Sequence, residues 1–143
     1  MKKLVLFLTI CAFAVPVFAQ QQVINQGKSQ FLLIIRFKAD FQPPSDEAVK
    51  ANIKKWQDYM AALAKSGALV NGYQPASGGL TISGSAKTLK TDPYISEGEQ
   101  VSSVLVINAA DMEAAKAIAE KCPIFEFGGS IEVRPVMNTA GQQ

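Results

Sequence analysis

Two strand–helix–strand patterns follow one another along this chain, and few folds accept that order. The run from Phe31 to Phe37 is short, nearly all apolar and rich in strand formers, which is typical of a strand buried on both faces. A helical pattern follows over residues 45–66, with apolar residues at alternating spacings of four and three. These spacings return to one side of an α-helix, which is therefore expected to pack on a sheet. The stripe consists of Val49, Ile53, Trp56, Met60 and Leu63.

The ends of this first helix are marked by their own residues. Ser45 precedes two acidic residues and can cap the helix, since a serine oxygen accepts a hydrogen bond from the first turn. Gly67 suits the position just past the helix end. Trp56 lies on the apolar stripe, so we interpret it as a core anchor in preference to a ligand-stacking residue.

The second half of the chain repeats the pattern with weaker signals. Strands are expected at residues 68–73, 80–83 and 101–107, with a loop at 75–79 and a strand edge followed by a loop over 83–94. Asn108 is expected to cap a second helix, which Pro123 ends. Pro135 confines the last strand, with Ile131, Val133 and Val136, to an edge or terminal position. The second apolar stripe consists of Met112, Ala115, Ile118, Ala119 and Cys122, the last interpreted as a small buried hydrophobe in preference to a reactive thiol.

This order of elements, βαββαβ, predicts an α+β fold of the ferredoxin-like kind, with two helices on one face of an antiparallel sheet. The first strand carries large apolar side chains on both faces, for example Leu33 on one and Ile34 on the other. A single layer of helices leaves one of those faces open. We therefore predict a homodimer in which two such sheets pack face to face.

Composition limits the chemistry. The chain has 143 residues, 2 cysteines and no histidine, which suits one domain and excludes His-dependent nucleophiles and His-ligated zinc. No spacing typical of a metal site is present, and no nucleotide-cofactor fingerprint, so we expect neither a metal nor a cofactor. No basic stripe with interleaved aromatic residues is present, so nucleic acid is not an expected partner.

The first residues are typical of a secretory signal. Lys2 and Lys3 precede an apolar run over residues 4–19, and the best cleavage site follows Ala19. An uncleaved anchor is the alternative, although the run is short for a membrane span. Removing the two lysines brings the formal net charge from +2 to 0 and leaves Cys122 as the one cysteine. We expect an exported protein, periplasmic or secreted, with a leader at 20–30, a domain at 31–137, a disordered tail at 138–143 and no stable membrane span after cleavage.

Three segments carry a resemblance to a known family. They are residues 56–69 with Trp56-Gln57-Asp58-Tyr59, residues 109–123 ending in Cys122-Pro123, and residues 129–136, which are the most specific. Together they resemble the YCII-related domains, and within them the DGPF branch. The resemblance implies a ferredoxin-like fold that dimerises into an α/β barrel.

The chain departs from that family at its name motif, Asp-Gly-Pro-Phe. Read without gaps, Thr91 stands at the Asp position, Tyr94 at the Phe position and Ser96 at the position of a following Glu. Asp92 and Glu97 lie one residue further along. Some YCII-related proteins are suspected of catalysis by a His–Asp pair, and this chain has no histidine.

Two functional hypotheses from different classes follow. A purely structural or interaction protein is a third hypothesis. The first is a non-catalytic dimeric module that binds a small molecule or a protein partner. The second is a small isomerase- or lyase-like enzyme that uses loop carboxylates and tyrosine, with Asp92, Tyr94 and Glu97 as candidate catalytic residues. Tyr73 is a further candidate acid or base. The predicted ligand-binding residues are Arg36, Tyr73, Thr91, Asp92, Tyr94, Ser103 and Arg134.

Overall fold

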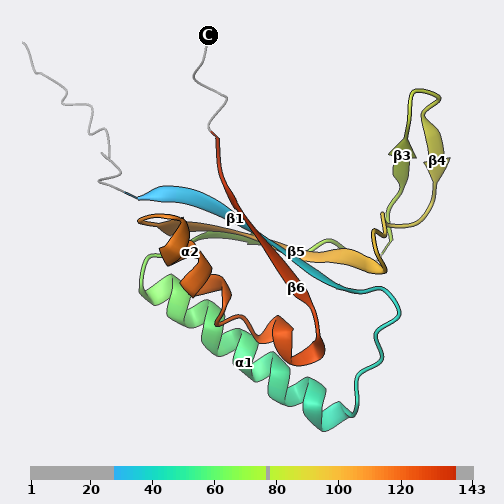
Figure 1. Ribbon diagram of the computed structural model, residues 1–143. Helices are drawn as coiled ribbons and strands as arrows, with labels where there is room; N and C mark the ends of the chain where they lie inside the picture. The colour runs from blue at the N-terminus through green and yellow to red at the C-terminus, as the bar shows by residue number, and fades with distance from the viewer. Residues whose placement is uncertain (1–27, 77, 138–143) are drawn as a thin grey trace, which may run out of the picture.

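The computed structural model describes residues 28–76 and 78–137. Within them, two α-helices pack on a four-stranded antiparallel sheet, and a two-stranded hairpin projects from it (Figure 1). The predicted signal, residues 1–19, and the tail, residues 138–143, lie outside the described residues. The elements are β1 (Ser29–Lys38), α1 (Asp46–Lys65), β2 (Leu69–Tyr73), β3 (Thr81–Ser83), β4 (Thr88–Lys90), β5 (Glu99–Ala109), α2 (Met112–Ala119), the 3₁₀-helix η1 (Pro123–Phe127) and β6 (Ser130–Pro135).

The main sheet has the strand order β2-β5-β1-β6, and each neighbouring pair is antiparallel. This α+β arrangement is compatible with the predicted ferredoxin-like fold, with β3 and β4 inserted as a hairpin before β5. The edge position predicted for the last strand is confirmed, since β6 pairs only with β1 among the described strands and ends at Pro135. β1 begins at Ser29, inside the segment expected to be a leader.

The core lies between the helices and one face of the sheet. Both helices lie on that side (Figure 1), so alternate residues of the central strands are buried there. Leu33, Ile35 and Ile107 are completely buried. Leu32 and Ile34 point to the other face and are only half-buried. The expectation that β1 is buried on both faces is therefore wrong within one chain, because no helix of residues 28–76 and 78–137 covers the second face.

The face of α1 that is buried differs from the prediction, whereas the two ends of the helix agree with it. Ser45 caps the helix as predicted, with its hydroxyl oxygen accepting from the Ala48 N–H at 3.1 Å, and Gly67 has a φ of +68°. The buried helical residues are Asn52, Tyr59 and Leu63, whereas Ile53 is 50% exposed. The apolar stripe is thus wider than the surface that the sheet covers, and one flank of it remains accessible.

The second helix begins later than predicted. Asn108 lies inside β5, and the cap is Asp111, whose carboxylate accepts from the Ala114 N–H at 2.8 Å. The prediction of Asn108 as cap is wrong because the strand continues through it to Ala109. Cys122 is buried as predicted, but it lies beyond the helix, where Pro123 starts the unpredicted η1. The segment 83–94, expected to be mostly loop, contains β4.

Candidate functional site

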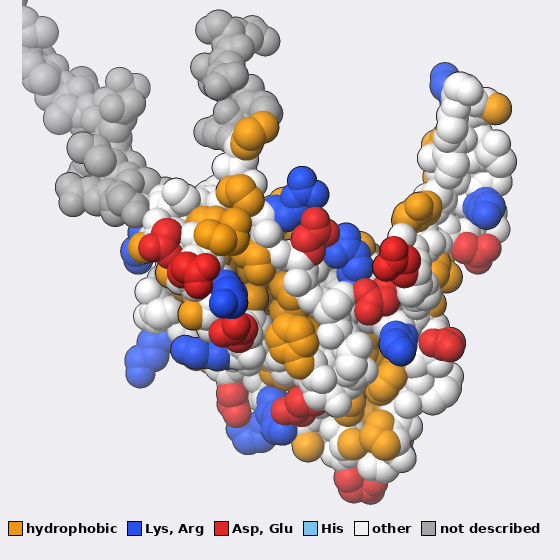
Figure 2. Space-filling view, in the orientation of Figure 1, with side chains coloured by type: hydrophobic (Ala, Val, Ile, Leu, Met, Phe, Trp, Pro, Cys, Tyr) orange, Lys and Arg blue, Asp and Glu red, His pale blue; other side chains and the backbone are white. Residues whose placement is uncertain are grey.

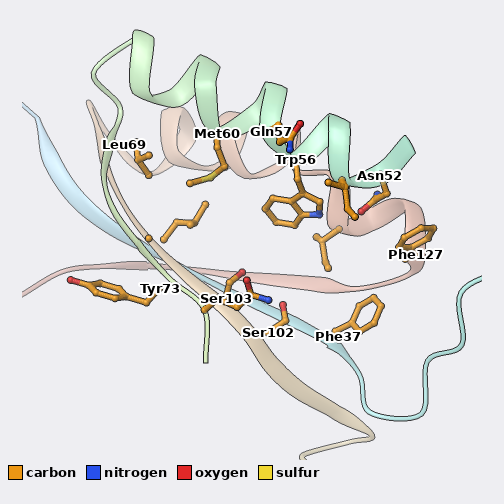
Figure 3. A pocket seen from close by; sticks show the side chains of 15 residues that line it. Phe37, Asn52, Trp56, Gln57, Met60, Leu69, Tyr73, Ser102, Ser103 and Phe127 are labelled. Carbon is orange, nitrogen blue, oxygen red and sulfur yellow. The ribbon is translucent and has the colours of Figure 1, made fainter. Parts of the chain in front are cut away.

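A cavity of about 890 Å³ lies between the exposed flank of α1 and the edge of the sheet formed by β2 and β5 (Figure 3). Ile53, Trp56 and Met60 line it from the helix. Ser103 and Leu105 of β5 lie across from them. Its volume is within the range of small-molecule binding sites in proteins.

A glycine in β2 and a bulge in β5 leave this space open. Gly72 of β2 has no side chain, so the edge strand leaves room where the cavity begins, and a Cβ there would lie 3.0 Å from Leu105 Cδ2. β5 also has a bulge, since Ile35 pairs with Ser103 whereas Arg36 pairs with Val101. Bulges redirect side chains beside functional sites, and this one brings Ser102 to the cavity together with Ser103.

Aromatic side chains close one end of the cavity. The rings of Phe37 and Phe41 meet edge to face at a centroid distance of 4.4 Å, and Phe41 lies 5.2 Å from Phe127. Trp56 projects into the same space in Figure 3, with its ring 6.0 Å from that of Tyr59. Trp56 is half-buried, so it packs on the core as predicted and also faces the cavity.

Polar contacts fix η1, which carries Ile124 and Phe127, against α1. Asn52 is buried and its amide donates to the Pro123 carbonyl at 3.1 Å and to Glu126 at 3.2 Å. Lys55 donates to the other oxygen of Glu126 at 2.6 Å. The hydrogen bond from Lys55, then that from Asn52, lowers the pKa of the Glu126 carboxyl. Glu126 is thus ionised in its structural role and does not line the cavity.

Among the residues that the structure describes, no Asp, Glu, Lys or Arg lines the cavity. Its polar side chains are hydroxyls and amides, and among these Ser102 already donates to the Ile35 carbonyl at 3.3 Å. Such a lining can hold an uncharged, largely apolar molecule and position it through a few hydrogen bonds. It offers no carboxylate or amine to move a proton.

Two of the residues predicted to bind a ligand line this cavity. Ser103 lies on its floor, and Tyr73 lies at its rim, where its hydroxyl accepts a hydrogen bond from Asn71 at 2.6 Å. Tyr94 lines a second hollow of about 760 Å³ at the foot of the hairpin, and is 69% exposed. The two hollows meet at Gln74 and Ser102, which line both.

The two arginines lie elsewhere. Arg36 and Arg134 are on the face of the sheet opposite the helices, where both pair with Glu132, at 2.9 and 3.1 Å. Their guanidinium groups, that of Arg36 most strongly, lower the pKa of the Glu132 carboxyl. The structure therefore does not bring Arg36 and Arg134 together with Ser103 or Tyr73 in the cavity.

The loop residues Thr91, Asp92 and Glu97 are exposed and line neither hollow. The Asp92 carbonyl accepts a hydrogen bond from the Thr81 hydroxyl at 2.8 Å, which ties the loop to the foot of β3. Glu97 has a φ of +53° in a tight turn. Residues at such positions commonly form turns, and nothing brings these three to the cavity.

Most residues that line the cavity were not identified from the sequence. Ile53 and Met60 were assigned to the core because they share a helical stripe with Leu63. The signals that could have found the cavity are the breadth of that stripe and the glycine at position 72, inside a predicted strand. Phe37 and Phe127 gave no such signal, because only the fold brings these distant residues to the same cavity.

Cys122 and Tyr59 form a buried pair of titratable groups outside the cavity. Burial raises the pKa of the Cys122 thiol from 9.0 to about 11, and also raises that of the Tyr59 hydroxyl, which donates to the Ile118 carbonyl. The folded chain therefore keeps a proton that the unfolded chain releases. The contribution of the Cys122 thiol to the free energy of unfolding is therefore expected to be complete below pH 9 and to be lost as the pH rises through 11.

This expectation can be tested by urea unfolding at several pH values. The Cys122→Ala variant should show a flatter loss of unfolding free energy between pH 9 and 11 than the original chain. Identical profiles for the two proteins would contradict the assignment of this alkaline loss to Cys122.

Fold and site together define a small α+β protein with a cavity beside its sheet whose described lining carries no charged side chain. A search of curated proteins found no match. The model of the YCII-related domain matches residues 29–140, and the chain belongs to that family. Within residues 28–76 and 78–137, no helix is long and apolar enough to cross a membrane, and no cluster of three or more potential metal ligands is found.

Proposed function

We propose that this chain is a non-catalytic, dimeric binding module that takes an uncharged, largely apolar small molecule in the cavity between α1 and the β2–β5 edge. The proposal rests on the lining, which is largely apolar and aromatic and, among the described residues, contains no charged side chain. The candidate catalytic residues Asp92, Tyr94 and Glu97 do not line it. This placement supports binding over the alternative, acid–base catalysis by the loop carboxylates.

The dimer is proposed from the face of the sheet that the helices leave open. Leu32 and Ile34 of β1 and their partners Val106 and Val104 of β5 form an apolar band across its two central strands. An apolar band of this kind is usually covered by a partner. A second copy packed sheet to sheet would cover it and produce the α/β barrel that the family resemblance implies. We further propose that the module acts after export, in the periplasm or outside the cell.

Energy transfer from Trp56 to the neutral fluorescent probe N-phenyl-1-naphthylamine tests the binding site directly. Trp56 is the single tryptophan of the chain and faces the cavity, so a bound probe quenches its emission. The Ile53→Asp variant places a charge on the cavity wall and is expected to weaken probe binding by roughly tenfold, because the carboxylate must lose water or remain beside an apolar ligand.

The matched control is Ala51→Asp, which adds the same charge to an exposed position of the same helix. It is expected to leave the probe affinity within about twofold, since position 51 does not line the cavity. Equal binding by the Ile53→Asp and Ala51→Asp proteins, or no quenching of Trp56 in the original chain, would refute the site.

A further inference from the structure

The β3–β4 hairpin has one apolar face and one polar face. Ile82 and Leu89 are paired directly across the two strands, so their side chains share a face. The pairs on either side of them put Thr81, Lys90, Ser83 and Thr88 on the opposite face. Ile82 is 61% exposed and Leu89 58%. Figure 2 shows hydrophobic side chains both on this hairpin and where it joins the body.

Exposed apolar side chains are concentrated on and beside this hairpin. Among the described residues, five of the thirteen exposed large hydrophobic side chains lie between positions 80 and 95. Strands of three residues in an isolated two-stranded hairpin are marginally stable in water. The hairpin makes no extensive contact with the other helices and strands of the described chain. Its apolar face is therefore suited to a surface that one copy does not supply.

The direction and length of the hairpin indicate which surface its apolar face meets. The hairpin rises from the end of the sheet on the side away from the helices, which is the side of the open face (Figure 1). The extended strand β3 is Thr81–Ser83. From residue 80 to residue 84, four extended steps span about 13 Å, whereas two packed sheets lie about 10 Å apart. A hairpin of this length therefore extends past the gap between two face-to-face sheets and lies beside the second copy.

We propose that the β3–β4 hairpin is a dimerisation arm, which packs the apolar face formed by Ile82 and Leu89 on the second copy. This inference rests on the proposed sheet-to-sheet dimer and adds an element that holds the two copies together.

Sedimentation equilibrium of residues 20–143 compares two double variants. The Ile82→Asp/Leu89→Asp protein is expected to dissociate at least tenfold more readily, and the Ser83→Asp/Thr88→Asp control, charged on the polar face, less than threefold.

The outcomes separate the arm from the dimer itself. An original chain that is monomeric at micromolar concentration overturns both proposals. A dimer that Val104→Asp dissociates but that Ile82→Asp/Leu89→Asp leaves intact overturns the arm alone. Equal weakening of the dimer by both hairpin variants also overturns the arm alone.

A photo-crosslinking benzoylphenylalanine at position 89, in a mixture of ¹⁴N and ¹⁵N copies, is expected to link different copies. Crosslinks confined to one copy overturn the arm.

Discussion

Replacing Leu33 with alanine is expected to lower the free energy of unfolding by about 2–5 kcal/mol. Leu33 is completely buried in the strand between β5 and β6, on the face of the sheet where the helices lie (Figure 1). The truncation removes apolar contacts and leaves a cavity that paired strands on both sides cannot collapse to fill. Urea unfolding, followed by Trp56 fluorescence, measures the loss.

Leu32→Ala is the matched control, since it makes the same truncation one residue earlier on the open face. Leu32 is half-buried within one chain, so its truncation is expected to lose about 1 kcal/mol in a monomer. The comparison is made at a protein concentration low enough to dissociate dimers. Equal losses for the two variants under these conditions would contradict the one-sided core.

The second large effect is expected at Gly129, between η1 and β6. A Cβ at this position would overlap Ile124 Cγ1 and lie 2.6 Å from the Arg36 carbonyl oxygen. That oxygen belongs to the central strand and cannot move without disturbing its pairing with β5 and β6. Gly129→Ala is therefore expected to lose about 3 kcal/mol of unfolding free energy, measured by the same urea unfolding.

Gly128 provides the neighbouring control, because a Cβ there meets no atom within 4 Å. Its φ of +71° is left-handed, so Gly128→Ala is expected to lose about 1 kcal/mol through backbone strain alone. A Gly129→Ala protein as stable as Gly128→Ala would show that Ile124 and β1 yield to the added methyl group.

The sequence was sufficient for both α-helices, for the four strands of the main sheet and for their order, because periodicity is a local property, but it was not sufficient for β4, η1 or the cap of α2. The ends of α1 followed from Ser45 and Gly67, and the edge position of the last strand from Pro135. The rotation of α1 about its axis did not follow. Its stripe is apolar over more than one contact surface, and only the tertiary packing of η1 and the sheet selects Asn52 and Tyr59 for burial.

The candidate site was accessible from the sequence only in part. Ser103 and Tyr73 follow from their places on predicted strands, and both line the cavity. Arg36 was expected beside them, but strand pairing puts it on the opposite face with Glu132. Whether the loop acids reach the cavity depends on the path of the loop, which short-range patterns do not determine. The aromatic end wall joins residues 37, 41 and 127, which are distant in sequence.

Native mass spectrometry of residues 20–143 with added N-phenyl-1-naphthylamine tests the dimeric binding module most directly, since one spectrum reports both mass and bound probe. We expect a dimer that takes up two probe molecules, one for each cavity, and an Ile53→Asp dimer that takes up fewer at the same probe concentration. A monomer, or a dimer whose probe uptake is unchanged by Ile53→Asp, would contradict it.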